Sequence, residues 1–159
     1  GVARHFERTE PGIEFEVITL PMDYHYFDRL TNVKLRNRLT DDELRTAYQQ
    51  ADLLVMPLKD ATANNSLLEA MACGLPMGVS DLPGVRDYVK DECASFVPVG
   101  DCSAFASSII SLRDDPALRT KLGERGRALA LDCSFPKVSR MTEDVYLQVA
   151  AADRPPGSS

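Results

Sequence analysis

Short apolar runs alternate along this chain with segments in which apolar residues recur every three or four positions. Runs rich in valine, isoleucine and leucine are typical of strands, and the longer spacing is typical of helices that pack by one face. We expect strands at 14–20, 33–36, 53–56, 77–80 and 95–98. The alternation of strands with helices predicts an α/β domain, with a Rossmann-like parallel sheet flanked by helices.

Local signals predict where several helices begin and end. The run Thr40-Asp41-Asp42-Glu43 predicts a capping box that starts a helix through Tyr48. A helix at 66–72 is expected to end at Gly74, because glycine readily adopts the left-handed conformation of a C-terminal cap. Residues 1–10 are expected to be the end of a helix that begins outside this sequence, closed by Pro11-Gly12. A turn at 82–84 is expected to open a short helix to Val89.

The last third of the chain is expected to be helical. Asp101 is predicted to cap one helix, and Pro116 starts a second at a position where its missing N–H is not needed. Ser134 is predicted to cap a third helix. Two of these helices carry apolar residues at helical spacing, namely Phe105, Ile109 and Leu112 in the first and Phe135, Val138, Met141, Val145 and Val149 in the third. We assign 1–150 to one domain and 151–159 to a flexible tail.

Composition narrows the class of protein. The chain has 159 residues, with 24 acidic against 18 basic side chains and a net charge of −6. It is long enough for one globular domain with an aliphatic core. The acidic balance and the absence of a basic run argue against nucleic acid as a partner. The apolar run at 53–58 is too short for a transmembrane segment.

The four cysteines, Cys73, Cys93, Cys102 and Cys133, form no CxxC pair, and the chain has two histidines. Structural zinc sites use clustered ligands, so we expect no metal site. We expect the cysteines to be reduced and partly buried, as in a cytoplasmic protein.

The strand-loop-helix unit at 53–74 is the first candidate for a site. Ligands of open parallel sheets bind beyond the carboxyl ends of the strands, where loops lead into helix N-termini. The helix start at Asn64-Asn65-Ser66 is suited to a phosphate or diphosphate. The same residues are equally expected as plain helix caps.

Glu69 is a carboxylate in an otherwise apolar helix, one turn after that start. Buried carboxylates are rare unless they have a partner. If the helix start holds a diphosphate, Glu69 is placed to accept hydrogen bonds from ribose hydroxyls. The alternative is an exposed glutamate on the one stripe of the helix that faces solvent.

From residue 39 to 98 the chain resembles the C-terminal, donor-binding domain of the group 1 glycosyltransferases, which have the GT-B fold. The most distinctive segment is the run Leu67-Leu68-Glu69-Ala70-Met71-Ala72-Cys73-Gly74-Leu75-Pro76. Further matches lie at 42–57, 80–89 and 96–101, and weaker ones at 122–127 and 134–135.

The resemblance implies retaining transfer of a sugar, of hexosyltransferase type, from a nucleotide-diphosphate sugar, with no cofactor and no obligatory metal. By position, Glu69 matches a glutamate that holds the ribose hydroxyls. Asn64, Asn65, Ser66 and Leu67 match the helix start whose N–H groups face the diphosphate. Residues around Arg36 and Arg38 match the loop beside the nucleobase.

Two departures from the family pattern bear on activity. Eight positions before Glu69, which matches the second glutamate of the family's Glu-x7-Glu motif, the family has its first glutamate near the donor sugar. Here Ala61 stands in place of this first glutamate, with Asp60 next to it. Asp60 is our candidate catalytic residue, provided that the loop bulges. The family's first strand, its glycine-rich turn with Arg and Lys, and its acceptor-binding domain would precede residue 1. We expect this chain to be the truncated half of a longer two-domain enzyme and to be inactive alone.

A different class of function remains open. The chain could be a non-catalytic nucleotide-binding or protein-interaction module that kept the fold, which Ala61 favours. A sugar-nucleotide epimerase related to the GT-B enzymes is a third alternative. Contact with a membrane surface would have to come from the acceptor-binding domain, and the sequence leaves the nucleotide, sugar and acceptor open.

Overall fold

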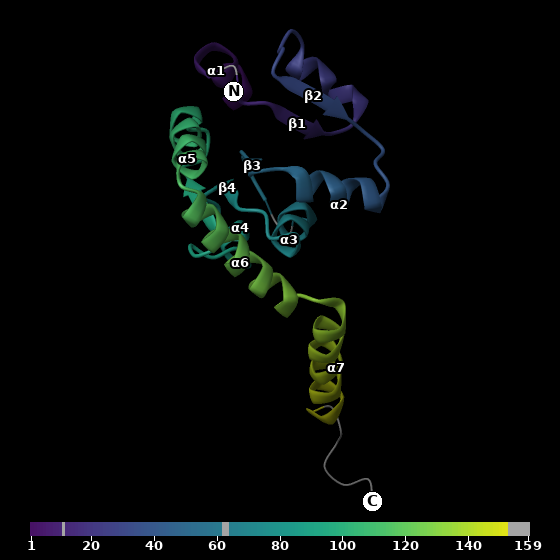
Figure 1. The fold of residues 1–159 in the computed structure, drawn as a ribbon. Helices are drawn as coiled ribbons and strands as arrows, with labels where there is room; N and C mark the ends of the chain where they lie inside the picture. Colours follow the sequence, from purple (N-terminus) through teal and green to yellow (C-terminus); the bar gives the residue numbers. More distant parts are fainter. Residues whose placement is uncertain (11, 62–63, 153–159) are drawn as a thin grey trace, which may run out of the picture.

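The computed structural model describes residues 1–10, 12–61 and 64–152. Residues 153–159 of the predicted tail, the closing Pro11 and two residues of the 60–65 loop lie outside the described residues, whereas residues 151 and 152 belong to the last helix. Helices and strands alternate as expected (Figure 1). Their order is α1 (Val2–Thr9), β1 (Phe15–Ile18), the 3₁₀ helix η1 (Pro21–Phe27), β2 (Val33–Arg36), α2 (Asp41–Gln50), β3 (Leu54–Met56), α3 (Asn65–Ala72), β4 (Met77–Ser80), α4 (Pro83–Arg86), β5 (Ala94–Val97), α5 (Cys102–Asp114), α6 (Pro116–Asp132) and α7 (Phe135–Ala152).

All strand pairs are parallel, which confirms the α/β class. Strand β1 pairs with β2, with Phe15 opposite Val33, and β3, β4 and β5 follow one another in a second sheet. Within the described ranges β1 and β3 are not hydrogen-bonded to each other, so the sheet that the sequence predicts is divided at this point. Because β3, β4 and β5 are parallel, their carboxyl ends lie at one edge, from which the loop to α3 leaves.

Two apolar clusters hold the elements together. One, which we call the α3–β4 cluster, contains buried residues of α3, β4 and the segment around α4. Its members are Leu67, Ala70, Met71, Leu75, Met77, Val79, Val85, Val89, Cys93 and Ala94. The other joins α1, β5 and α5 through Val2, Phe6, Val97, Phe105, Ala106 and Ile109. Phe15 of β1 and Val55 of β3 both pack against this second cluster. Apolar packing therefore connects the two sheets where strand pairing does not.

Four of the predicted helix ends are present, at Thr40, Gly74, Asp101 and the start of α6. The Thr40 N–H donates to Glu43 Oε2 at 2.8 Å and the Glu43 N–H to Thr40 Oγ1 at 3.3 Å, which completes the capping box. Gly74 has φ 72°, the left-handed conformation that favours glycine. The side chains of Asp101 and Asp115 cap α5 and α6.

Two boundaries differ from the sequence prediction by two residues or more, and others by one residue. The strand expected at 14–20 is limited to Phe15–Ile18 because the chain turns at Pro21 into η1, which the sequence pattern did not predict. The short helix expected to reach Val89 ends at Arg86, although the Val89 N–H still donates to the Val85 carbonyl at 2.9 Å.

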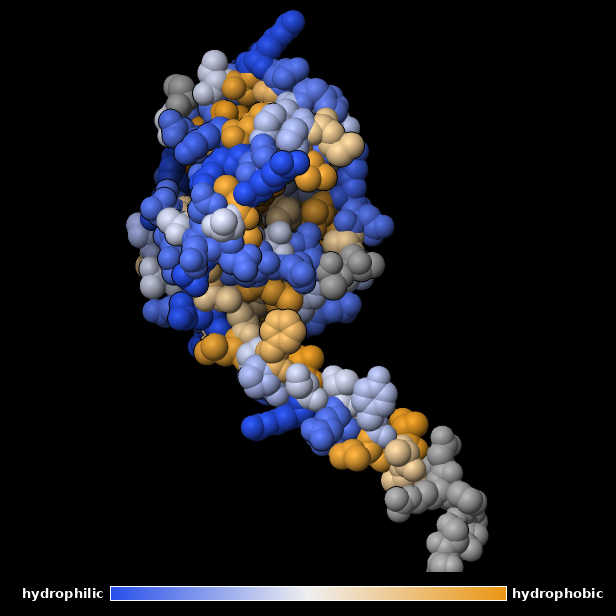
Figure 2. Space-filling view, turned by 90° about the vertical axis from the view of Figure 1, so that its right-hand side faces the viewer, coloured by the Kyte–Doolittle hydropathy of each residue, from blue (hydrophilic) through white to orange (hydrophobic). Residues whose placement is uncertain are grey.

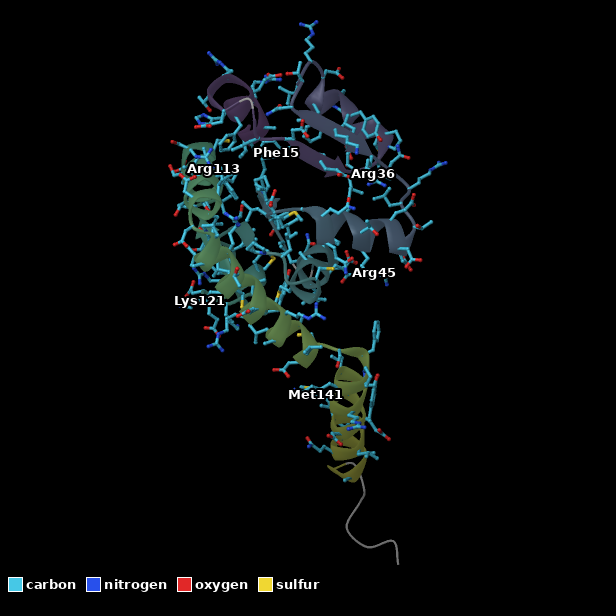
Figure 3. All side chains as sticks on the ribbon, in the orientation of Figure 1. Phe15, Arg36, Arg45, Arg113, Lys121 and Met141 are labelled. Atoms are coloured by element: carbon cyan, nitrogen blue, oxygen red, sulfur yellow. The ribbon has the colours of Figure 1, made fainter. Side chains whose placement is uncertain are left out.

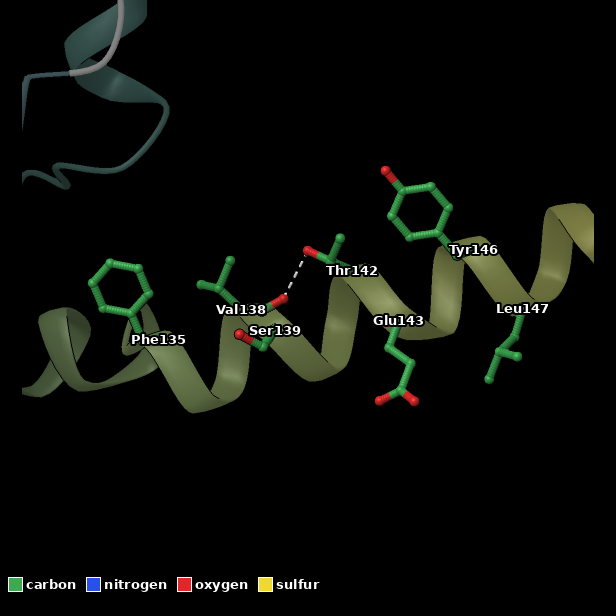
Figure 4. Close-up of a pocket in the computed structure, with 7 residues that line it drawn as sticks. All are labelled: Phe135, Val138, Ser139, Thr142, Glu143, Tyr146 and Leu147. Carbon is green, nitrogen blue, oxygen red and sulfur yellow. Dashed lines mark hydrogen bonds between the residues drawn. The ribbon is translucent and has the colours of Figure 1, made fainter.

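Helix α7 extends away from the rest of the molecule (Figure 1). Its helical spacing was predicted, but its apolar side chains are exposed, Phe135 by 91%. Figure 2 shows apolar residues along this protruding helix, whereas the surface of the body in that view is mostly hydrophilic. In Figure 4 Val138 lies between Phe135 and Thr142, and the Thr142 hydroxyl donates to the Val138 carbonyl at 2.8 Å. None of the described helices is long and apolar enough to cross a lipid bilayer.

Candidate functional site

The loop between β3 and α3 carries Asp60 and Ala61. Asp60 is exposed, whereas Ala61 is partly buried and packs against the α3–β4 cluster. Ala61, which the resemblance matched to a family glutamate, therefore packs against the core, and its neighbour Asp60 is exposed. Thr62 and Ala63, which follow, lie outside the described residues.

Asn64 begins α3 as its N-cap. Its Oδ1 accepts from the Ser66 N–H at 3.0 Å, and its carbonyl accepts from the Leu67 N–H at 3.2 Å. The Asn64 N–H itself donates to the Tyr88 hydroxyl at 3.1 Å. Three of the N–H groups expected to face an anion thus have partners within the chain, as in a plain cap. Asn65 is exposed at the first position of the helix, where its positive end lies.

Glu69 lies on the exposed side of α3, so the second of the two alternatives for its environment is correct. The neighbouring side chains of Leu67, Ala70 and Met71 are buried. The Tyr48 hydroxyl donates to Glu69 Oε2 at 3.1 Å, and this contact joins α2 to α3. The carboxylate is therefore accessible and held by one of its oxygens.

Tyr48 is only partly exposed, and it packs against the α3–β4 cluster. Burial raises the pKa of Tyr48 to about 12, and the negative charge of Glu69 acts in the same direction. A hydrogen bond with the Ser66 hydroxyl partly opposes this increase in pKa. At neutral pH the phenol is protonated, so that it acts as the donor to Glu69.

Basic side chains lie near the end of α3. Burial is the main cause that raises the pKa of the Cys73 thiol, and the positive charges of Arg127 and Arg45 oppose it. Arg45 lies on α2 (Figure 3).

Arg36 and Arg38 come from the other sheet. Arg36, labelled in Figure 3 at the end of β2, forms a 2.8 Å ion pair with Glu16 across the β1–β2 pair. Arg38 is exposed, with φ 50°. The structure thus places both arginines at the carboxyl end of β2, and it engages the Arg36 guanidinium within that sheet.

Sequence reasoning assigned no role to Tyr48 and Tyr88, although both contact the candidate site. Each contact spans more than twenty residues, and neither tyrosine stands in a pattern that predicts its partner. Only the helix spacing that puts Tyr48 near the end of α2 was available. Among the described residues no group of three or more His, Cys, Asp or Glu side chains is arranged to hold a metal ion.

The model of the family "Glycosyl transferases group 1" matches residues 13–115, which is more than half of the chain. The chain is 30% identical over 117 residues to a D-inositol 3-phosphate glycosyltransferase of Streptomyces bingchenggensis, covering 73% of this chain and 26% of that protein. It is 31% identical over 113 residues to the lipopolysaccharide core biosynthesis glycosyltransferase LpsE of Rhizobium meliloti, covering 70% and 32%. The chain thus spans about a quarter to a third of the length of these relatives.

Solved structures show the same fold. The sucrose-phosphate synthase of Thermosynechococcus elongatus has a TM-score of 0.72 at 25% identity, over 82% of this chain and 33% of that one. The HepE protein of Anabaena in complex with UDP has a TM-score of 0.76 at 16% identity, over 94% and 44%. The C-terminal domain of a group 1 glycosyl transferase of Francisella tularensis has a TM-score of 0.67 at 19% identity, over 82% and 73%. By its family match and its fold, this chain belongs to the group 1 glycosyltransferases.

Proposed function

We propose that this chain is the donor-binding part of a longer, two-domain glycosyltransferase and binds a nucleotide-diphosphate sugar for retaining transfer to an acceptor. Family membership and the similarity in fold to HepE, which was solved with UDP, support the nucleotide-sugar donor. The transfer itself requires the acceptor-binding domain, so the isolated chain is expected to be inactive.

The observation that carries this proposal is the placement of Glu69. It is an exposed carboxylate on a helix in which Leu67, Ala70 and Met71 are buried, one turn from the helix N-terminus and beyond the carboxyl end of β3. A diphosphate near Asn65 would lie at the positive end of α3, with the ribose one turn further along. A carboxylate at that distance accepts hydrogen bonds from the ribose hydroxyls.

The remaining residues have subordinate parts in the proposal. Asp60, the exposed carboxylate of the β3–α3 loop, is assigned to the donor sugar as the candidate catalytic residue. Arg36 and Arg38 are assigned to the nucleobase end.

The charge that develops on the departing diphosphate needs strong electrostatic stabilisation, which we assign to basic residues of the longer protein. We also propose a cytoplasmic protein that needs no metal or organic cofactor and does not bind nucleic acid; four free cysteines are in keeping with this location.

Calorimetric titration of the intact protein with UDP, comparing wild type with Glu69→Ala, tests the proposal. A lost hydrogen bond to a charged group costs about 1.5–3 kcal/mol, which is roughly ten-fold or more in affinity. Glu124→Ala, which removes an exposed carboxylate of α6, is the matched control and should bind UDP as the wild type does. Equal affinities of wild type and Glu69→Ala would exclude the ribose role.

Ala61 favours a second candidate function, that of a non-catalytic nucleotide-binding module. Its methyl group packs into the core where a catalytic glutamate would be expected. Assays of sugar release from UDP-sugars by the intact protein separate the two candidates. Binding with turnover that Asp60→Asn abolishes supports the enzyme, whereas binding without turnover over a panel of UDP-sugars supports the module.

A further inference from the structure

The Tyr48–Glu69 hydrogen bond joins the middle of the candidate donor site to a different helix. We propose that Tyr48 is a positioning residue, which holds one carboxylate oxygen of Glu69 so that the other is presented to the ribose hydroxyls of the nucleotide. This inference rests on the proposed function. It adds a residue of α2 to a site that sequence reasoning placed entirely on α3, the preceding loop and the end of β2.

The geometry restricts how Glu69 can turn. A glutamate on an exposed helix face has several rotamers of similar energy, and ordering it on binding costs side-chain entropy. The 3.1 Å bond from Tyr48 to Oε2 selects one of these arrangements before any ligand arrives. Oε1 then remains available on the exposed side of α3, and a ligand that uses it loses less conformational freedom.

Tyr48 is itself well anchored. Its ring packs against the α3–β4 cluster, against which Leu54 and Met56 of β3 also pack. Tyr48 thus connects α2 with the Glu69 carboxylate of α3.

The preference of the protein for UDP over an analogue that lacks the 2′- and 3′-hydroxyls of the ribose tests this role. The intact protein is titrated with UDP and with its 2′,3′-dideoxy analogue, and the ratio of the two dissociation constants is the readout. Wild type should prefer UDP by about ten-fold or more. Tyr48→Phe, which keeps the ring, should reduce this ratio by at least about three-fold, as expected for two residues in contact. Glu69→Gln should reduce it too, and adding Tyr48→Phe to Glu69→Gln should reduce it no further.

Tyr88→Phe is the matched control. Tyr88 is also only partly exposed and also contacts the α3 start, but through the Asn64 N–H. It should leave the ratio unchanged even where it weakens both ligands. Tyr48→Leu is a second variant that lacks the hydroxyl donor. Circular dichroism and thermal unfolding show which of the two Tyr48 variants is folded, and the titrations use the folded one.

The possible outcomes separate this inference from the function on which it rests. A ratio in Tyr48→Phe equal to that of wild type overturns the positioning role, as does an equal loss for both ligands, because that is the result of a merely structural role. A wild type that binds both ligands equally overturns the ribose site itself. A reduced ratio in Tyr48→Phe, absent in the Glu69→Gln background, supports the proposal.

Discussion

Gly123 of α6 lies directly against the backbone of Gly74 at the end of α3. A Cβ placed on Gly123 would come within 2.1 Å of the Gly74 carbonyl oxygen and 3.1 Å of the Gly74 carbonyl carbon. The two backbones can approach in this way because Gly123 has no side chain. This contact fixes α6 across the C-terminal end of the helix that carries Glu69.

Gly123→Ala should destabilise the protein. The added methyl group meets backbone, which cannot move aside as a side chain does, so we expect a loss of about 1–3 kcal/mol in the free energy of unfolding. Gly126→Ala on the same helix is the control, because its Cβ would meet Met71 at an ordinary 3.6 Å. There the helix propensity of alanine should dominate, with a gain of up to about 1 kcal/mol. Denaturant unfolding of both variants measures the difference, and equal stabilities would contradict the close contact.

Gly74→Ala tests the backbone conformation alone. At φ 72° a Cβ finds ordinary space, with its nearest atom 3.8 Å away, so the cost comes from the left-handed conformation. We expect a loss of about 1–2 kcal/mol for alanine and less for Gly74→Asn, since asparagine tolerates this region. The order alanine below asparagine below glycine in thermal unfolding checks the assignment; a stability of the alanine variant equal to wild type would refute it.

The capping box should make stability depend on pH. Hydrogen bonds from the Thr40 N–H and hydroxyl lower the pKa of Glu43 below its ordinary value of 4.5. The unfolded chain therefore binds the proton first as the pH falls, and the stabilisation is fully present above pH 4.5 and lost as the pH falls through the lower, folded-state pKa.

Glu43→Gln removes this titration while keeping the side-chain length. The difference in the free energy of unfolding between wild type and Glu43→Gln should be largest above pH 4.5 and decrease on acidification. Glu92→Gln, which changes an exposed carboxylate outside the capping box, is a control for the loss of one charge. A difference that grows as the pH falls would contradict the hydrogen bonds to Thr40.

The cysteines should differ in their reaction with a thiol reagent at pH 8. Cys102 and Cys133 are exposed and should react first. Cys73 is half-buried and burial raises its pKa, so that it should react more slowly. Cys93 is buried, with a raised pKa, and should react only when the protein unfolds. Single Cys→Ser variants assign each phase, and rapid reaction of Cys93 in the native protein would contradict the packing around β5.

Two phenylalanines separate core from surface. Phe105→Ala removes a side chain of α5 that is 1% exposed and should cost about 3–5 kcal/mol in the free energy of unfolding. Phe135→Ala on α7 removes one that is 91% exposed and should change stability by less than about 0.5 kcal/mol. Urea unfolding of the two variants measures both values. A large loss of unfolding free energy for Phe135→Ala would mean that α7 packs against another part of the protein, or a second molecule, in solution.

Much of the secondary structure follows from local signals. The capping box at Thr40 and the cap at Gly74 each act within a few residues, and the structure contains both. The segment at Pro21 was not predicted as helical, because its alternation of polar and aromatic residues has no helical period. The exposure of α7 could not be predicted from local signals either. The spacing of Phe135 and Val138 predicts an apolar helix face, but not whether another element covers it.

The candidate site was only partly predictable. Position along the chain placed Glu69 one turn into α3, and the resemblance supplied its proposed role. Neither could decide that Glu69 faces solvent, that Ala61 packs into the core, or that the N–H groups of the helix start are taken by Asn64 and Tyr88. These are contacts between segments far apart in sequence, which no local pattern encodes.

The sequence by itself determined the order of the strands and α-helices and several of the caps that end them, because these depend on residue spacing and on local hydrogen bonds. Its motifs also indicated the family to which the chain belongs. Tertiary structure alone decided the close approach of Gly74 and Gly123 and the bond from Tyr48 to Glu69. The physical reason is that two side chains or backbones meet only when the packing of separate elements brings them together. That packing placed a tyrosine of α2 beside the carboxylate of α3.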